Sequence, residues 1–424
     1  MIAVLFISLV VLFLIGVPVA IALGLSSSLA LLVAGDTPLL VLAQRAFVSL
    51  DSFPLMAIPL FMLAGVIMEY GGISQRLINL ANAITGHVSG GLAIVTVITT
   101  MFFAAISGSS VAATAALGSI LIPAMVKRGY HSEFAGSVQA VSGTLGIIIP
   151  PSIPLILFGV AAGTSIGDLF LAGMIPGIVI GLGLIITVII LSKKRNYLKE
   201  QKKTGAEIGK AFIDAIPALI MPVIILGGIY SGVFTATEAA GVAVAYAFLV
   251  SILFYKAINW KNIWELLTQA TITTSTIMFI IASAGLFSWI LTLQNVPQRV
   301  ANAFTSFSDN PTIFLVCIVI LLLLVGMFME TNASIIILAP ILAPVAMEIG
   351  INPVHFGIVM IVTLAIGMVT PPLGLNLFVA GKIGNVRLDQ LTKGMIPFYI
   401  AVLITLLIIV FIPSVSIGIL DLFD

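Results

Sequence analysis

The sequence predicts an all-α polytopic membrane protein made of two repeats with opposite orientation in the bilayer. Of its 424 residues, 61% are apolar and only 8% are charged, against about a quarter charged in an average soluble domain. The apolar runs are about 17 to 30 residues long, which favours membrane-spanning helices over barrel strands. A third observation is that a stretch of the second half repeats a stretch of the first half.

Composition also excludes several classes of protein. The 17 Lys and Arg against 16 Asp and Glu give a net charge of +1, so no basic patch for nucleic acid is available. Cys317 is the only cysteine and there are three histidines, which excludes a disulfide scaffold and leaves little for a transition-metal site. No basic residue precedes the N-terminal apolar run, so we predict a retained helix rather than a signal peptide.

The apolar runs give a first set of membrane segments. Two further stretches, 90–127 and 312–347, are interrupted at their middle by small or polar residues. Each is either two full spans or a re-entrant hairpin that enters and leaves on one side. The predicted spans are 2–34, 54–70, 133–160, 170–191, 211–231, 234–255, 272–292, 354–382 and 394–416.

The basic residues predict the orientation. With the basic segment 192–210 in the cytoplasm and both interrupted stretches treated as hairpins, 15 Lys and Arg fall inside and only Arg45 and Arg299 fall outside. This predicts a cytoplasmic N-terminus and a periplasmic C-terminus. Residues 37–51 and 256–270, the latter with Trp260 and Trp264, are predicted to lie in the membrane plane; plain loops are the alternative.

An internal repeat organises the chain. Shifted by 221 residues, 107–178 aligns with 328–399 without a gap, and 18 of 72 positions are identical, ten of them Gly, Pro or Asp. The topology gives the two copies opposite orientation, an architecture common in secondary transporters; an old duplication without alternating access is the alternative. The predicted parts are a first repeat (1–191, hairpin 90–127, broken helix 133–160), a basic linker with a connecting helix (192–232), and a second repeat (233–424, hairpin 312–347, broken helix 354–382).

Each repeat carries two breaks at membrane depth. A polar interruption lies in each hairpin, and a Pro-Pro pair lies in the next helix, at Pro150-Pro151 and Pro371-Pro372. Because proline removes a donor and clashes with the preceding turn, two in a row unwind the helix, and the freed backbone groups need partners. Oxygen ligands at such breaks suit a monovalent cation, and broken-helix N-termini suit a carboxylate.

These breaks provide the candidate binding residues. For each single serine the alternative role is a helix cap or a helix–helix contact. For Na⁺ the candidates are Ser107, Gly108, Ser109, Ser110, Pro150, Pro151, Glu330, Thr331, Asn332, Thr370, Pro371 and Gly374. For the substrate they are Ser107, Ser109, Ser152, Asn332, Thr370 and Asn376.

The energy source is predicted by elimination. Gly209-Lys210 precedes Ala211 and Gly381-Lys382 precedes Ile383, so neither forms a nucleotide-binding P-loop, and an ion gradient remains. Glu330 is the acidic residue closest to the predicted site, where it either helps to bind cations or carries protons.

The motifs resemble those of the large membrane subunit of tripartite ATP-independent periplasmic (TRAP) transporters over essentially the whole chain. Ala236 stands where family members usually have proline. The motifs are Ser107-Gly108-Ser109-Ser110, Ile149-Pro150-Pro151-Ser152, Gly232 to Ala240, Thr370 to Asn376, and the Gly-Met-Ile-Pro blocks at 173–176 and 394–397.

The resemblance implies properties beyond the residues themselves. Such subunits work in the bacterial inner membrane with a small four-helix membrane subunit and a soluble periplasmic substrate-binding protein. They use Na⁺ to carry small-molecule carboxylates inward by an elevator movement, and this chain looks closest to the sialic-acid branch, although C4-dicarboxylate members share the motifs. No small subunit is expected to be fused here, because the first helix starts at Met1.

Two other functions compete. A stand-alone ion-coupled carrier or channel would need no binding protein. An intramembrane hydrolase using Ser107 or Ser109 would need a general base, and only Glu330 is available at membrane depth. We therefore expect no enzyme activity.

Overall fold

The computed structural model describes residues 1–424 except 36–37, 39, 198–200, 260–261, 306–309 and 423–424. The described residues form helices and connecting loops, with no β-strand among them. Within this described part, nine helices are long and apolar enough to cross a membrane. The predicted all-α polytopic class is thereby confirmed.

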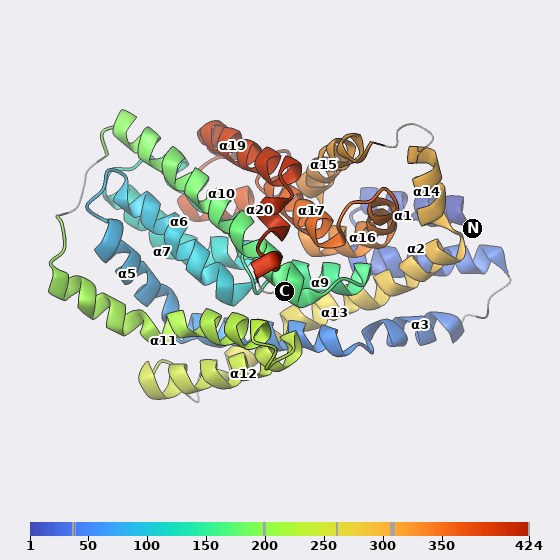
Figure 1. The fold of residues 1–424 in the computed structure, drawn as a ribbon, viewed down its shortest axis with the longest axis horizontal. Helices are drawn as coiled ribbons and strands as arrows, with labels where there is room; N and C mark the ends of the chain where they lie inside the picture. The colour runs from blue at the N-terminus through green and yellow to red at the C-terminus, as the bar shows by residue number, and fades with distance from the viewer. Residues whose placement is uncertain (36–37, 39, 198–200, 260–261, 306–309, 423–424) are drawn as a thin grey trace.

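The first half of the chain runs from α1 to α10 and contains two 3₁₀ turns, η1 and η2 (Figure 1). Its elements are α1 (Ile2–Leu14), α2 (Val19–Ala34), α3 (Leu40–Leu50), η1 (Phe53–Met56), α4 (Ala57–Tyr70), α5 (Ile73–Thr85), α6 (Gly91–Ser107), α7 (Ser110–Lys127), α8 (Ser132–Gly143), η2 (Thr144–Ile147), α9 (Ile153–Ala162) and α10 (Ile166–Lys194).

The second half runs from α11 to the C-terminal turns, with a π-helical turn, η3, after α12. Its elements are α11 (Gly205–Tyr230), α12 (Ala236–Leu249), η3 (Val250–Phe254), α13 (Ile263–Leu293), α14 (Val296–Thr305), α15 (Pro311–Phe328), α16 (Thr331–Glu348), α17 (Pro353–Gly367), α18 (Leu375–Gly384), α19 (Leu388–Phe411), α20 (Ser414–Ile417) and η4 (Leu420–Leu422).

The element bounds follow the sequence repeat. Adding 221 to the bounds of α7 gives 331 and 348, the bounds of α16. The same shift moves the start of α8 onto that of α17, and it moves α9 to within one residue of α18 at both ends. Each half therefore has two helices that meet at a polar tip (α6–α7 and α15–α16), followed by a broken helix (α8–η2–α9 and α17–α18).

The stretch before each tip corresponds as well, with one difference. Adding 223 to Leu40 and Tyr70 gives 263 and 293, the bounds of α13, so α3, η1 and α4 together match one continuous helix. In the first half the helix is interrupted beside Pro54, which lacks the backbone donor. The segment 256–270, predicted to lie in the membrane plane, is therefore not a separate helix: from Ile263 onward it is continuous with α13, and Trp260 lies outside the described residues.

The N-terminal prediction needs a second correction. Residues 2–34 were expected to form one span, but α1 and α2 are separate helices that pack side by side in opposite directions (Figure 1). Gly16 adopts φ +79° and Pro18 caps α2, and both residues interrupt a continuous helix. The chain thus returns to its starting end, which removes the basis for a cytoplasmic N-terminus without affecting the later segments.

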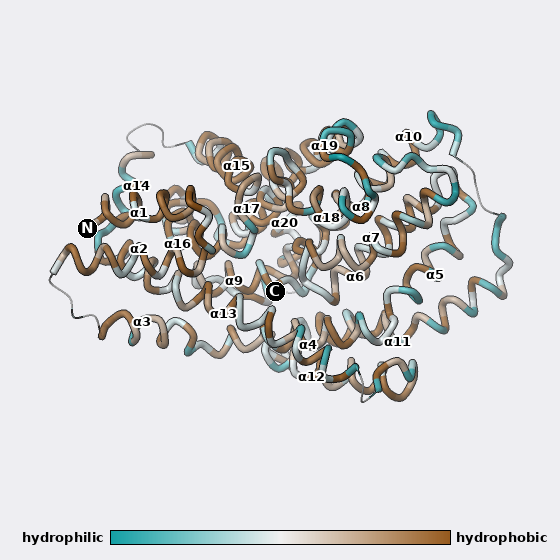
Figure 2. Tube along the Cα trace, turned by 180° about the vertical axis from the view of Figure 1, so that it is seen from behind, coloured by the Kyte–Doolittle hydropathy of each residue, from teal (hydrophilic) through white to brown (hydrophobic). Residues whose placement is uncertain are grey.

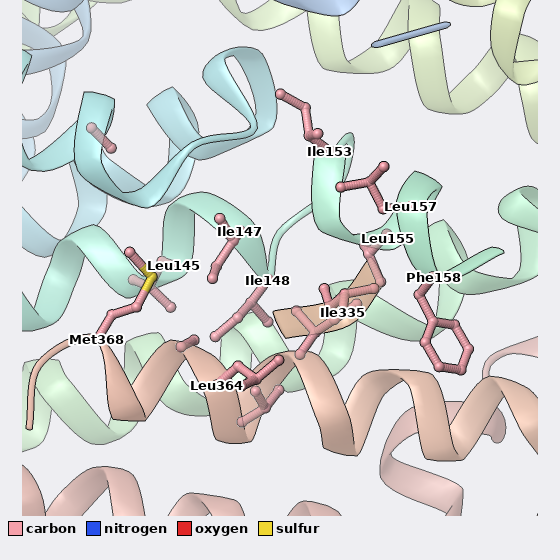
Figure 3. Packing of buried hydrophobic residues seen from close by; sticks show 14 of the residues in the cluster. Leu145, Ile147, Ile148, Ile153, Leu155, Leu157, Phe158, Ile335, Leu364 and Met368 are labelled. Carbon is pink, nitrogen blue, oxygen red and sulfur yellow. The ribbon is translucent and has the colours of Figure 1, made fainter. Parts of the chain in front are cut away.

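The two halves exchange packing partners at the centre. In addition to its own half, α9 packs along α16, and α18 packs along α7 and α8. Figure 3 shows the buried layer this creates, with Leu145 beside Met368, Ile148 facing Leu364 on α17, and Ile335 near Leu155. Because lipid tails are as apolar as leucine, close packing rather than exclusion from water stabilises this layer within a bilayer.

Hydrophilic residues concentrate where the chain leaves the apolar body. Figure 2 shows them at the C-terminal end of α10 and the N-terminal end of α11, whereas α15 and α16 are largely hydrophobic. The described part of the basic segment includes the exposed residues Lys193, Lys194 and Arg195 at this end. Its place next to long apolar helices is that expected of an extramembrane loop.

Candidate functional site

The first tip is a sharp reversal between α6 and α7. Gly108 adopts φ +59°, a conformation that favours glycine, and a Cβ added there would lie 3.2 Å from the Pro151 carbonyl oxygen. Ser109 caps α7, and its Oγ accepts a hydrogen bond from the Ala112 amide at 3.4 Å. The tip is therefore seated against the first Pro-Pro break, and the buried Ser107 Oγ has no hydrogen-bond partner there.

The first break begins at η2 and ends where Ser152 starts α9. Its Pro150-Pro151 peptide bond is cis. Ser152 is buried, and its Oγ donates to the carbonyl oxygen of Ile147 at 2.6 Å. This bond satisfies one of the carbonyls that the break frees, so the predicted ligand Ser152 already has a structural role.

The second tip carries a carboxylate at the equivalent position. Glu330 caps α16: its Oε2 accepts from the Ala333 amide at 3.4 Å, and its Oε1 accepts from Asn332 Nδ2 at 2.6 Å. Asn332 Oδ1 is buried without a partner. Thr331 Oγ1 donates to the Met368 sulfur at 3.0 Å, and this contact ties the second tip to the second break.

The second break runs from Met368 to Gly374, where α18 begins. Pro371-Pro372 is also a cis bond, and Gly374 adopts φ +53°. Thr370 Oγ1 donates to the Ile366 carbonyl oxygen at 2.8 Å, and Tyr399 Oη donates to the Val369 carbonyl oxygen at 2.6 Å. The break is thus held by side chains that bond to its freed carbonyls.

Asn376 connects the second break to the first tip. Its Nδ2 donates to Ser110 Oγ at 2.7 Å and to the Ala140 carbonyl oxygen at 3.1 Å. Both Asn376 and Ser110 are buried, and Asn376 Oδ1 has no partner. Residues 266 apart in sequence are thereby joined within one site.

Two polar residues near this junction were not among the predicted ligands. Gln139 on α8 is fully buried; its Nε2 donates to the Ala113 carbonyl oxygen at 3.2 Å, and its Oε1 has no partner. Ser142, one turn further on, also has a buried oxygen without a partner. Gln139 does not stand out in the repeat because its counterpart is Met360, but a glutamine inside an apolar helix is itself a signal of a functional position.

The oxygens available define the chemistry. Among the described residues, no three His, Cys, Asp or Glu side chains lie close enough to hold a metal ion. Around the tips and breaks, the buried side-chain oxygens without a hydrogen-bond partner are hydroxyl and amide oxygens from both halves: Ser107, Gln139, Ser142, Asn332 and Asn376. Neutral oxygens of this kind, next to unwound backbone, suit a hard monovalent cation.

The fold has a counterpart among solved structures. It resembles the YdaH transporter of Alcanivorax borkumensis with a TM-score of 0.64 over 89% of this chain and 88% of that one, at 15% identity. The chain thus has the fold of a polytopic helical membrane transporter.

Comparison of the sequence with known families identifies the family of the chain. A family profile described as "Tripartite ATP-independent periplasmic transporter, DctM component" matches residues 6–415, and the chain belongs to this family of TRAP large permeases. It is 42% identical to the C4-dicarboxylate large permease DctM of Pseudomonas aeruginosa, over 89% of this chain and 88% of the relative. It is 36% identical to the sialic acid large permease SiaM of Vibrio cholerae, over 96% of both.

A third relative is longer. The isethionate permease protein DctMQ of Oleidesulfovibrio alaskensis is 42% identical over 95% of this chain, but the chain spans only 63% of that relative. The family is one of transport permeases for organic acids rather than of enzymes. Relatives named for isethionate, C4-dicarboxylates, sialic acid and 2,3-diketo-L-gulonate lie at 36–42% identity, so similarity alone does not select a substrate.

Proposed function

We propose that this permease couples the inward movement of Na⁺ to the uptake of an organic carboxylate. Sialic acid is the substrate we favour from the motifs, and C4-dicarboxylates, diketogulonate and the sulfonate isethionate are the alternatives that the relatives' names supply. All four are organic anions, so one binding chemistry accommodates the whole set.

The bond from Asn376 to Ser110 carries this proposal. It joins the N-terminal ends of α18 and α7, which come from opposite halves, at a point where both helices begin inside the protein. Helix N-termini present unpaired amides and a partial positive charge, which suits a substrate carboxylate. In transporters with inverted repeats the substrate site lies at the interface of the two repeats, and this bond lies at such an interface.

The buried oxygens support the choice of Na⁺ as the coupling ion. Ser107 Oγ lies at the first tip, and Asn332 Oδ1 lies at the second; both lack a hydrogen-bond partner. We assign cation sites to both tips, completed by backbone oxygens of the neighbouring breaks. One monovalent charge crossing ~100 mV releases about 2.3 kcal/mol, so two ions suffice for strong accumulation of a monoanion.

The remaining parts of the proposal follow the family. We infer a location in the bacterial inner membrane, a small four-helix membrane partner and a periplasmic binding protein that delivers the substrate. We further propose that the tips and broken helices move together as an elevator past the other helices. We also propose that the segment 192–210 lies on the cytoplasmic side of the membrane and that the C-terminus lies on the periplasmic side.

Proteoliposomes test the proposal directly. We would reconstitute the chain with its small partner, add loaded sialic-acid-binding protein outside, and compare uptake under an inward Na⁺ gradient with an equal K⁺ gradient. Uptake that requires both Na⁺ and the binding protein is the expected result. Uptake with a dicarboxylate-loaded protein keeps the mechanism and replaces the substrate; uptake of free substrate without any binding protein points to a stand-alone carrier.

Ser110→Ala provides the internal check. Ser119 lies on the same helix but is exposed, so Ser119→Ala is a matched control. We expect Ser110→Ala to lower Na⁺-driven uptake about tenfold, since it leaves the Asn376 amide without one acceptor. Equal uptake by the two variants would show that the bond from Asn376 to Ser110 is not needed for transport.

A further inference from the structure

An apolar groove lies between α6, α10 and α11, outside the site described above. Figure 1 shows α6 between α10 and α11. The groove has a volume of about 630 Å³. Every side chain that lines it is apolar; Met101, Ile149, Leu182 and Leu219 represent its four sides.

The groove opens on the outer surface of the protein. Ile178 and Leu182 on α10 are 44% and 53% exposed, and Val223 on α11 is 67% exposed. These residues continue the exposed apolar face of α10 through Ile186 and Ile190, which is the kind of surface that faces lipid. In a bilayer, therefore, hydrocarbon rather than water has access to the groove.

The volume of the groove indicates what kind of molecule it can hold. A helix about 10–12 Å across fills roughly 500 Å³ per turn, so the ≈ 630 Å³ of the groove encloses little more than one turn of a partner helix. An acyl chain is narrow and flexible enough to follow an irregular apolar channel. The volume thus favours a lipid chain over a protein segment.

Basic residues lie on α10 about two turns beyond the last side chain that lines the groove. Met174, Ile178, Leu182 and Ile185 line the groove at spacings of four, four and three residues, and the same face of α10 continues to Lys193. Lys193 and Lys194 are exposed. From Leu182 to Lys193 a helix rises about 16 Å, which is close to half of the ~30 Å hydrocarbon thickness.

We propose that this groove binds one acyl chain of an anionic phospholipid, whose headgroup phosphate lies at Lys193 and Lys194. The chain would fill the space between α11 and the pair α6–α10 and would touch Pro150 at the first break. The inference is independent of the transported substrate and of the coupling ion.

Photo-crosslinking of the full chain in nanodiscs tests this. The probe is phosphatidylglycerol with a diazirine near the end of one acyl chain, and labelled peptides are mapped by mass spectrometry. We expect label on the peptides that contain Met101, Met174 and Leu219, at about fivefold or more above the matching phosphatidylcholine probe, in line with the attraction of each lysine for an anionic headgroup.

Variants separate the groove from the general lipid surface. Val223→Trp fills the groove and should lower this labelling at least fivefold, whereas Ile404→Trp, on the exposed face of α19, should not. Lys193→Gln with Lys194→Gln should abolish the preference for phosphatidylglycerol. If Val223→Trp proves unstable, competition by unlabelled phosphatidylglycerol on the unmodified chain replaces it.

Three results would overturn the proposal. One is label spread evenly over exposed apolar faces such as that around Ile404. Another is equal labelling by the two lipids. The third is loss of label when the small membrane subunit is present, because that would assign the groove to a protein interface.

Discussion

The two tips share a backbone but differ in charge. Ser109 and Glu330 occupy equivalent positions, each caps the following helix, and each accepts a hydrogen bond at 3.4 Å from the amide of an alanine three residues on. The first tip is neutral and bonded to the other half through Asn376, whereas the second carries a carboxylate and is bonded to its own break through Thr331. Both copies of the repeat therefore use this position to cap the following helix. Only the second copy has a carboxylate there.

The largest expected effect is that of Asn376→Leu, which removes the side-chain bonds from the second break to the first tip and to α8. It leaves the Ser110 hydroxyl and the Ala140 carbonyl without their buried donor, at about 1–3 kcal/mol each. We expect Na⁺-driven uptake to fall about a hundredfold, while Asn79→Leu on the exposed face of α5 stays within twofold. Uptake by Asn376→Leu above half of the normal rate would show that the halves do not depend on this bond.

Next in size is the effect of Gly367→Ala on stability. A Cβ there would lie 2.6 Å from Gly326 Cα, and in the first half a Cβ on the equivalent Gly146 would lie 2.6 Å from the Ser109 carbonyl oxygen. We expect either substitution to lower the free energy of unfolding by about 1–3 kcal/mol, measured by thermal melting. Gly209→Ala, with open space around it, is the control and should be neutral or stabilising. A loss of stability from only one of the two substitutions would show that the two glycines are not structurally equivalent.

Glu330→Ser separates the cap from the charge. Serine is a good N-cap, so the unfolding free energy should change by less than about 0.5 kcal/mol. The Na⁺ concentration for half-maximal uptake should rise about tenfold, because a negative charge beside the proposed cation site is lost. Glu348→Ser, at the exposed end of the same helix, should leave it unchanged. If the Na⁺ concentration for half-maximal uptake is unchanged in Glu330→Ser, the carboxylate does not contribute to cation binding, and the two tips do not differ in this function.

The smallest effect is expected for Thr331→Val. The lost bond is to a thioether sulfur, a weak acceptor, and the side chain keeps its shape. Uptake should therefore fall no more than about twofold, as for the exposed control Thr268→Val. A loss beyond tenfold would instead identify the Thr331 hydroxyl as a ligand of ion or substrate.

The sequence was sufficient to predict the repeated arrangement of tips and broken helices. Gly, Pro and Asp at a fixed spacing revealed the repeat, because these residues act on the local backbone, and the bounds of α7 and α16 agree with that spacing. The N-terminal run misled for a related reason: Gly16 and Pro18 were read as residues within one long apolar span, although together they end one helix and begin the next.

The site could be predicted only in part. The tips and breaks were identifiable, but the bond from Asn376 to Ser110 joins residues whose positions in their repeats differ, since the counterpart of Asn376 is Leu155. Gln139 was missed for the same reason, because Met360 stands opposite it. Contacts of this kind depend on how the halves pack, which local pattern does not encode.

The exchanged packing of α9 with α16 and of α18 with α7 has a consequence for ancestry. Two separate copies of a half-length chain, inserted in opposite directions, would make the same exchanged contacts as an isologous pair. Such a pair must carry the same residue at both tips. Joining the copies into one chain releases that restriction, so that a serine at one tip and a glutamate at the other become available to a single molecule.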